Sequence, residues 1–253
     1  MPRFSHRSPE LELLDAPHIP FADIRQNMRE LDTINTLLGG HRITIKGLSF
    51  LLNGCSKEQT YSLLEIGCGD GNNLRVIRKW AEQNGWKLQL SGVDYNEACI
   101  AYTESLASNR GIQFYCSDYR KTPLQTKPHF IFSSLFCHHF SNEQLVEQLY
   151  WMQQNATGGF FINDLHRHPF AYHSIRILTQ LFSKSYLVKN DAPLSVLRGF
   201  SKKEWRALLQ QSGIAEAEVK WKWAFRWLIV WQKKMLQQNQ HTAIPTTTQM
   251  HGN

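Results

Sequence analysis

The sequence of 253 residues lacks any uninterrupted apolar run of roughly 18 residues, the length that a membrane-spanning helix needs. Its first residues, MPRFSHRSPELELLD, are polar where a secretory signal peptide carries an apolar core. We therefore expect a cytoplasmic protein with no transmembrane segment. The 42% of apolar residues is enough to bury a substantial core in one globular domain.

Cysteine is scarce and shows no pattern typical of a metal site. The five cysteines form no CxxC pair and no zinc-type spacing with histidine, and their number is odd. We therefore expect free thiols, mostly buried, and no metal site.

The first two thirds of the chain carry no excess of positive charge. Residues 166–253 carry 13 basic and 4 acidic side chains, and they hold all of the net charge of +7. No RG repeat or long basic run accompanies this excess, so we expect a solvated surface and do not favour a nucleic-acid partner. The remaining candidates for a partner at this surface are an acidic carrier protein and an anionic membrane surface.

From Tyr61 onward, short apolar runs alternate with amphipathic stretches. The apolar runs are 61–66, 88–93, 112–116, 129–135 and 158–163, with helical patterns at 72–84, 96–108 and 142–153. This alternation predicts an α/β domain over 61–235 with a mostly parallel sheet and helices on both faces. Residues 215–234 predict two final strands, with Trp221, Trp223 and Trp227 on one face.

Three further segments lie outside this alternation. Residues 1–60 carry helical spacing at 21–54 and predict an N-terminal helical cap. Residues 165–200 interrupt the rhythm after the fifth strand, and we expect them to form a lid over the ends of the strands. The polar stretch 236–253 has no periodicity and predicts a disordered tail.

A glycine-rich loop follows the first predicted strand in the segment LEIGCGDGNN (64–73). Glycines at alternate positions allow a sharp turn and close approach of a ligand, and the following helix begins with unpaired N–H groups. The spacing is GxGxG, whereas a dinucleotide fingerprint reads GxGxxG. The loop therefore indicates a nucleotide-like ligand; its spacing counts against a nicotinamide dinucleotide, and a nicotinamide oxidoreductase stays open as a further alternative.

Acidic residues end the next two predicted strands. Asp94 stands where a carboxylate accepts the hydroxyl protons of a ribose. Asp118 is placed to accept a hydrogen bond from an adenine amino group, with Tyr119 beside the base. Each acid alone is more typical of a helix cap, but their shared position at the strand ends favours a binding site.

The set of motifs ExGxGxG, VDYN, SDYR and FSSLFCHHF, within residues 60–165, resembles class I S-adenosylmethionine-dependent methyltransferases. The resemblance is to the branch of the ubiquinone and menaquinone biosynthesis methyltransferases and related natural-product enzymes. It implies a Rossmann-like seven-stranded sheet and S-adenosylmethionine as cofactor. The cofactor-binding residues that it implies are Glu65, Gly67, Cys68, Gly69, Gly71, Asp94, Tyr95, Asp118, Tyr119 and Leu135.

Histidines follow the fourth and fifth strands, where the transferred methyl group is expected. We expect His138 or His139 to remove a proton from the acceptor, and in an extended segment only one of them faces it. Asp164 and His166 form a second candidate acid–imidazole pair, and a loop salt bridge is the alternative. The candidate substrate-binding residues are Arg167, His168, Tyr172, Arg198 and Phe200.

The leading hypothesis is methyl transfer to a small aromatic, phenolic or polyketide-like acceptor, with O-methylation preferred. Two alternatives stay open besides the oxidoreductase. One is an RNA or protein methyltransferase that uses the basic C-terminal third. The other is a cofactor-binding partner protein without turnover.

Overall fold

The computed structural model describes residues 4–16 and 18–233, so the predicted tail lies outside the described residues. One sheet carries seven strands: β1 (Thr60–Ile66), β2 (Lys87–Asp94), β3 (Gln113–Cys116), β4 (Phe130–Ser134), β5 (Gly159–Leu165), β6 (Glu218–Lys222) and β7 (Arg226–Gln232). Their order is β3-β2-β1-β4-β5-β7-β6, and β7 alone runs antiparallel to both of its neighbours. The predicted mostly parallel α/β sheet is confirmed.

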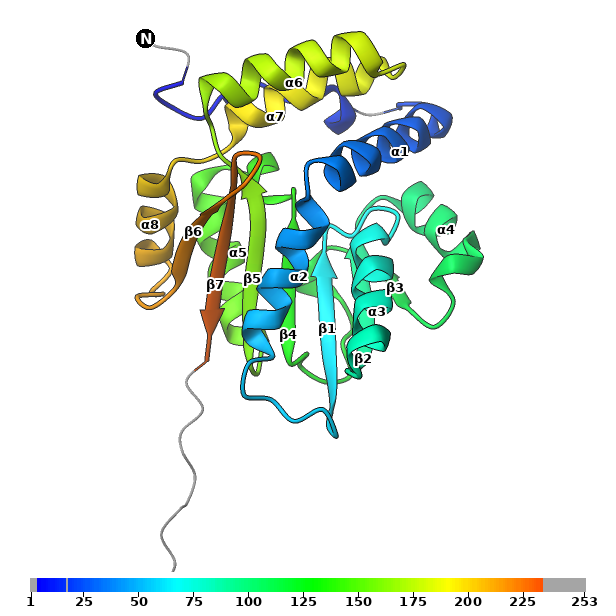
Figure 1. Cartoon of the computed structure of the whole chain (residues 1–253), viewed down its shortest axis with the longest axis vertical. Coiled ribbons are helices and arrows are strands. Elements are labelled where there is room, and N and C mark those ends of the chain that lie inside the picture. The colour runs from blue at the N-terminus through cyan, green and yellow to red at the C-terminus, as the bar shows by residue number, and fades with distance from the viewer. Residues whose placement is uncertain (1–3, 17, 234–253) are drawn as a thin grey trace, which may run out of the picture.

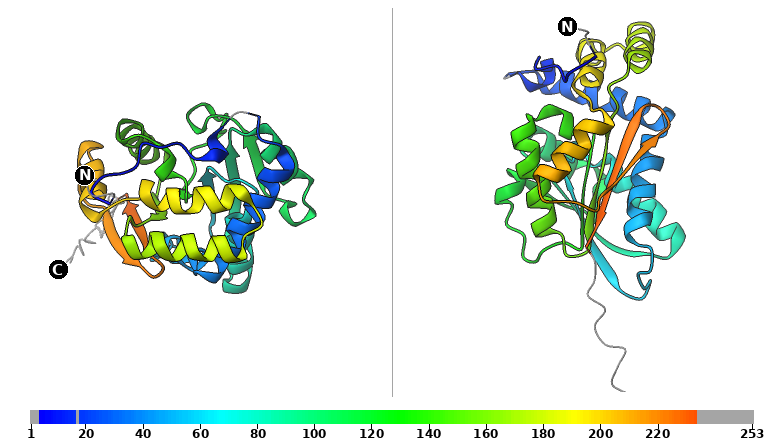
Figure 2. Two further views of the ribbon diagram at one scale, coloured as in Figure 1. Left: turned by 90° about the horizontal axis from the view of Figure 1, so that it is seen from above. Right: turned by 90° about the vertical axis from the view of Figure 1, so that its left-hand side faces the viewer.

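The described residues form eight α-helices: α1 (Phe21–Leu37), α2 (Gly40–Leu51), α3 (Asn72–Asn84), α4 (Glu97–Ser105), α5 (Asn142–Asn155), α6 (Pro169–Phe182), α7 (Tyr186–Arg198) and α8 (Lys202–Gln211). Helices α2 and α3 cover one face of the sheet, and α5 and α8 cover the other (Figures 1 and 2). Short 3-10 helices include η1 (Leu13–Asp15), η2 (Ala107–Asn109), η3 (Tyr119–Lys121) and η4 (Cys137–His139). No helix in the described part of the chain combines the length and hydropathy needed to cross a bilayer.

Alternation of side chains along β5 shows why this strand is central. Phe160 and Ile162 pack in the core beneath α5 and α8, and Phe161 packs in the core beneath α2 and α3. A strand covered on both faces needs apolar residues at successive positions, which is the pattern that the sequence carries. Helix α2, which we expected in a cap, therefore belongs to a helical layer of the sheet.

Helices α1, α6 and α7 form a roof over the carboxyl ends of the parallel strands, whereas α4 packs beside β3 (Figure 1). Helices α6 and α7 make up most of the predicted lid segment, and they lie with α1 at the end of the molecule where β1 and β5 finish (Figure 1). The N-terminal residues run along α7, where the backbone N–H groups of Leu13 and Leu14 donate to Asp191.

The predicted single face of tryptophans is wrong for one of the three. Trp221 and Trp227 are cross-strand partners in β6 and β7. Trp223 instead lies exposed in the turn between these strands, where Ala224 and Phe225 both have positive φ. The strand pattern is interrupted there because the chain reverses its direction.

Candidate functional site

The glycine loop joins the end of β1 to α3, and its three glycines have different surroundings. A Cβ at Gly67 would collide with the ring of Phe136, and one at Gly71 would lie 2.8 Å from Phe114 Cζ. A Cβ at Gly69 would meet nothing within 4 Å. All three have positive φ, so the loop needs glycine for its conformation, and Gly69 alone also faces open space.

Asp94 is tied to this loop from the neighbouring strand. Its carboxylate accepts hydrogen bonds from the backbone N–H groups of Gly69, at 3.1 Å, and Asn96, at 3.0 Å. Burial raises the pKa of Asp94 in spite of these bonds. One bond to each oxygen leaves lone pairs on both oxygens, which is what a pair of ribose hydroxyls requires.

Glu65 and Asp118 lie at the ends of β1 and β3 with contrasting surroundings. Glu65 is buried, its Oε1 accepts from Asn73 Nδ2 at 2.8 Å, and its Oε2 has no partner. Burial raises the pKa of Glu65 well above its ordinary value. The Asp118 carboxylate instead accepts hydrogen bonds from Nε and Nη2 of Arg120, and these bonds lower the pKa of Asp118. An adenine amino group at Asp118 would therefore share this carboxylate with Arg120.

A first cavity of about 300 Å³ opens beside these strand ends. Five of the predicted cofactor residues line it: Gly67, Asp94, Tyr95, Asp118 and Tyr119. The predicted residue Cys68 is buried against Gly92 and Leu74 instead. The lining of the cavity thus includes the carboxylates of Asp94, Asp118 and Glu147 together with aromatic rings, a combination that suits a nucleoside.

A second cavity of about 360 Å³ lies beneath the roof and is lined mainly by apolar side chains. Helices α1, α6 and α7 and the turn between β6 and β7 contribute to it. Leu135, predicted at the cofactor, lines this second cavity and has φ of 55°. Phe136 and Phe140 line the first cavity, so the segment 135–140 stands between the two.

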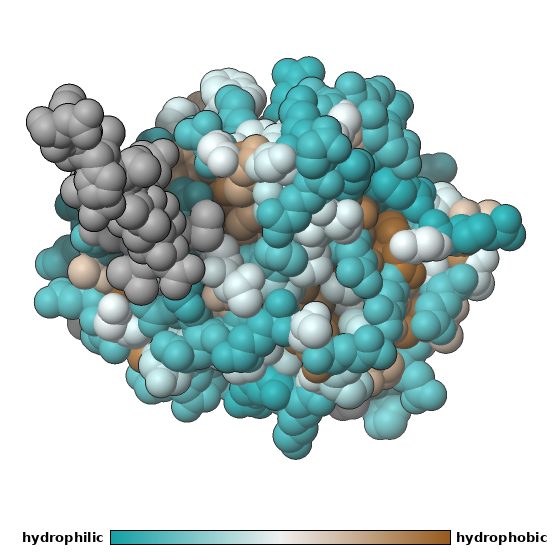
Figure 3. Space-filling view, turned by 90° about the horizontal axis from the view of Figure 1, so that it is seen from below, coloured by the Kyte–Doolittle hydropathy of each residue, from teal (hydrophilic) through white to brown (hydrophobic). Residues whose placement is uncertain are grey.

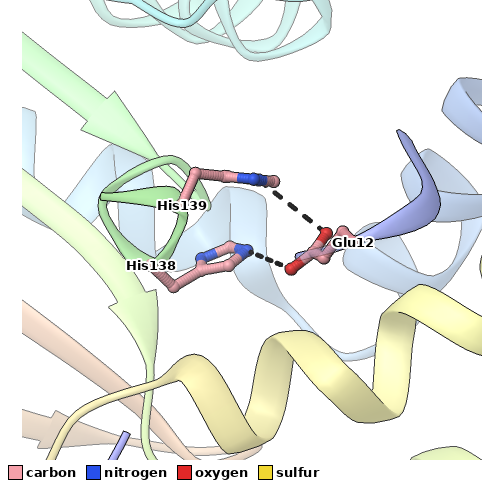
Figure 4. A group of neighbouring side chains, drawn as sticks. All are labelled: Glu12, His138 and His139. Atoms are coloured by element: carbon pink, nitrogen blue, oxygen red, sulfur yellow. Dashed lines mark ion pairs between the residues drawn. The ribbon is translucent and has the colours of Figure 1, made fainter. Parts of the chain in front are cut away.

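His138 and His139 line the second cavity and both face Glu12 (Figure 4). His138 Nε2 lies 3.6 Å from Glu12 Oε1, and His139 Nε2 lies 3.9 Å from Glu12 Oε2. The two rings are 4.5 Å apart. The expectation that only one of them faces the site is wrong, because η4 is a 3-10 turn and not an extended segment.

Each histidine has a carboxylate at its other ring nitrogen. His138 Nδ1 lies 2.8 Å from Asp164 Oδ1, and His139 Nδ1 lies 3.3 Å from Asp15 Oδ1. Burial lowers the pKa of His139, but Asp15 and Glu12 outweigh this effect and raise it above the ordinary value. His139 is therefore an oriented imidazole with strengthened basicity.

The predicted pairing of Asp164 with His166 is wrong, because Asp164 is held by the segment after β4. Its carboxylate accepts from the N–H groups of Phe136 and Cys137 in addition to His138. His166 instead accepts from Trp221 Nε1, and burial lowers its pKa to about 4. His166 lines neither the first nor the second cavity, which argues against its predicted catalytic role.

The two predicted substrate-binding arginines are buried and already paired. Arg167 binds Glu204 at 2.8 Å and donates to the carbonyl of Gly199. Arg198 donates to the carbonyls of His138, at 3.0 Å, and His139, at 2.8 Å. Neither guanidinium reaches the second cavity, so Arg198 positions the histidine turn and does not contact an acceptor there.

The other predicted substrate residues also lie outside the second cavity. His168 caps α6 by accepting from the N–H of Phe170. Tyr172 packs edge-on against Phe4, and Phe200 packs on Trp205 in the core. The aromatic character of the lid therefore serves packing at these positions.

Glu12 and Asp15 are site residues that the sequence did not reveal. They precede His138 by more than a hundred residues in a segment without a motif, so only the tertiary structure brings them together. Among the described residues, Glu12, His138 and His139 form a group whose ligand atoms lie within 4.8 Å of one another and could surround a metal ion. Glu12 Oε1 also accepts from Ser195 at 2.8 Å and lies 3.9 Å from Arg198 Nε, so its charge already has partners.

Part of the chain is similar in sequence to a known protein family. Residues 63–155 match the family model described as "Methyltransferase domain". No curated protein matches the chain. Residues 63–155 are therefore similar to a methyltransferase domain, and the strand order agrees with the class I methyltransferase fold predicted from the sequence.

Solved structures share this fold at low sequence identity. The plantazolicin methyltransferase BamL, in complex with a triazolic desmethylPZN analog and SAH, is 21% identical with a TM-score of 0.56, covering 78% of this chain and 68% of that one. The plantazolicin methyltransferase BpumL, with the same type of analog and SAH, is 19% identical with a TM-score of 0.54, covering 83% and 90%. PigF with SAH is 16% identical with a TM-score of 0.51, covering 73% and 53%.

Proposed function

We propose that this chain is an S-adenosylmethionine-dependent methyltransferase that O-methylates a small phenolic or polyketide-like acceptor. The observation that carries the proposal is the arrangement of two cavities on either side of the segment 135–140, with His139 at the wall of the second. The cofactor occupies the first cavity and the acceptor occupies the second. The solved relatives named above, which bind SAH, support the choice of cofactor.

The residues in and around the first cavity fit this cofactor. Asp94 in its wall has free lone pairs for the ribose hydroxyls. Gly69 and Glu65 do not line the cavity, but Gly69 leaves the neighbouring loop open and the buried Glu65 has an oxygen without a partner. When bound, S-adenosylmethionine supplies an electrophilic methyl group for an in-line displacement. Leu135 turns the chain after β4 and thereby shapes the wall between the two cavities.

The chain's own contribution to the reaction is to orient the acceptor and remove its proton. The hydroxyl O–H bond breaks as the proton moves to Nε2 of neutral His139, whose Nδ1–H points at Asp15. Glu12 lies beside the same nitrogen and stabilises the imidazolium that forms. The apolar walls exclude water from the reacting oxygen.

The test uses purified protein, labelled S-adenosylmethionine and a panel of simple phenols. We expect label in a methyl ether and micromolar binding of S-adenosylhomocysteine. His139→Asn is expected to lower kcat at least a hundredfold while cofactor affinity stays within twofold. His173→Asn, at an exposed position of α6, is the matched control and is expected to keep the full rate.

Three other outcomes contradict the proposal. Binding of NADH in place of S-adenosylhomocysteine overturns the cofactor. Label in protein or RNA only overturns the acceptor class and favours a macromolecular substrate. Binding without any transfer favours a non-catalytic partner protein. A carrier protein or anionic membrane as partner of the basic C-terminal third stays a prediction.

A further inference from the structure

A third cavity of about 410 Å³ lies between α1 and α6, next to the second cavity. Its lining residues are Glu30, Thr33, Ile34, Leu37, Leu38, Ile175, Leu178, Thr179, Phe182 and Ser183. We call it the α1–α6 cavity. It shares four apolar side chains with the second cavity: Ile34, Leu38, Ile175 and Leu178. The two cavities are therefore adjoining compartments with a common apolar wall.

The outer rim of the α1–α6 cavity exposes large apolar side chains to solvent. Leu37 is 79% exposed and Phe182 is 78% exposed, and Leu178 in the shared wall is 42% exposed. Helices α1 and α6 run across the same end of the molecule (Figure 2). The opposite end is covered mainly by hydrophilic side chains, with apolar atoms confined to narrow hollows (Figure 3). An apolar rim at the mouth of an apolar cavity is typical of a ligand-binding groove.

The second cavity carries polar side chains outside the wall that it shares with the α1–α6 cavity, including Asn35, Ser174 and Arg226. Glu12, His138 and His139 also line it, with Ser195, which donates to Glu12. The shared wall toward the α1–α6 cavity carries no polar side chain. A ligand that fills both compartments therefore has an oxygen-bearing head at the histidines and an apolar body toward α6.

We propose that the acceptor is an amphiphile, a phenolic head with an unbranched alkyl chain, and that the chain lies in the α1–α6 cavity. This inference rests on the proposed function, since it takes the second cavity as the acceptor site. The shared wall consists only of aliphatic side chains, from α1 with the residue after it and from α6, and a rotamer change of Leu38 or Leu178 would join the compartments. Leu37 and Phe182 then cover the end of the alkyl chain and lose their own contact with water.

The experiment measures binding of 4-alkylphenols to the complex with S-adenosylhomocysteine, from phenol itself to the octyl compound. Each buried methylene is expected to raise affinity about fourfold until the cavity is filled. Thr33→Trp adds a bulky ring at an exposed position of α1 that lines the α1–α6 cavity. We expect it to weaken octylphenol binding at least tenfold and to leave phenol binding unchanged.

Thr36→Trp is the matched control, because Thr36 is also exposed on α1 and lines none of the cavities described above. Equal effects of the two tryptophans overturn the assignment of the α1–α6 cavity. Methylation of phenol with no gain from longer chains overturns the inference and leaves the proposed function standing. Binding that rises with chain length but is followed by no methylation overturns the proposed function and leaves the α1–α6 cavity as the site of the alkyl chain. If no phenol of any length binds, both are overturned.

Discussion

Asp164→Asn is the substitution for which the structure predicts the largest loss of stability outside the apolar core. The carboxylate is fully buried and accepts four hydrogen bonds, from the N–H groups of Phe136, Cys137 and Leu165 and from the ring of His138. The charges of its surroundings keep the pKa of Asp164 low in spite of burial. The folded state therefore contains a buried, ionised and fully bonded carboxylate at the end of β5.

The size of the loss follows from these bonds. An asparagine of the same shape keeps one accepting oxygen but presents an NH₂ group to donors that it cannot satisfy. Removing one partner of a buried charged pair costs about 3–5 kcal/mol. In a protein of this size, 1 kcal/mol lowers Tm by about 2–4 °C, so we expect a drop of about 6–20 °C.

The assay is thermal and urea unfolding at pH 7, followed by circular dichroism. Asp118→Asn is the matched control, because Asp118 is also an acidic residue near the carboxyl end of a strand, but its partner Arg120 is half exposed. A pair exposed in this way contributes about 0–1 kcal/mol, so Tm is expected to change by no more than a few degrees. Equal shifts in the two variants, or a shift below 2 °C for Asp164→Asn, would refute the reasoning.

Three further predictions concern the binding site and the base. Asp94→Ala is expected to weaken S-adenosylhomocysteine about tenfold to a hundredfold in calorimetric titration, and unchanged affinity would remove Asp94 from the ribose site. Because Asp15 and Glu12 raise the pKa of His139 above its ordinary value and the base acts when neutral, kcat/KM should rise with pH as His139 loses its proton, at a higher pH than for an ordinary histidine. Asp15→Asn should move this rise to lower pH, and an unmoved profile would contradict the assignment. Because Glu12 is already paired with Ser195, we expect turnover to survive EDTA, and recovery only on adding Zn²⁺ would show a metal site instead.

The sheet and the cofactor side of the site were predictable because their signals are local. The glycine loop, Asp94 and Asp118 each follow a recognisable apolar strand, and parallel strands bring their carboxyl ends to one edge. The glycine motif also predicts the backbone conformation of the loop, because Gly67, Gly69 and Gly71 adopt the positive φ that glycine permits. Sequence neighbours and spatial neighbours coincide at this edge of the sheet.

The pairing of Asp164 was not predictable, because it depends on a turn that carries no glycine signal. Leu135 adopts φ of 55°, which bends the chain after β4 so that the following N–H groups point at β5. A leucine gives no indication of a left-handed conformation. The sequence therefore suggested His166, the nearest histidine along the chain, as the partner of Asp164. In the structure the partner is His138, which follows the neighbouring strand β4.

The second cavity, the proposed acceptor site, was still less predictable because its walls come from several separate parts of the chain, including the segment after β4 with Leu135, His138 and His139. Glu12, α1, the α6–α7 pair and the β6–β7 turn meet only when the roof closes over the sheet. Helices α1, α6 and α7 contribute no residue to the two core clusters on the faces of the sheet. We therefore expect substitutions in these helices to leave the core of the sheet intact. Acceptor preference can thus diverge through α1 and α6 while Asp94 and the glycine loop stay the same. That separation explains why the motifs identify the class of reaction and say little about the acceptor.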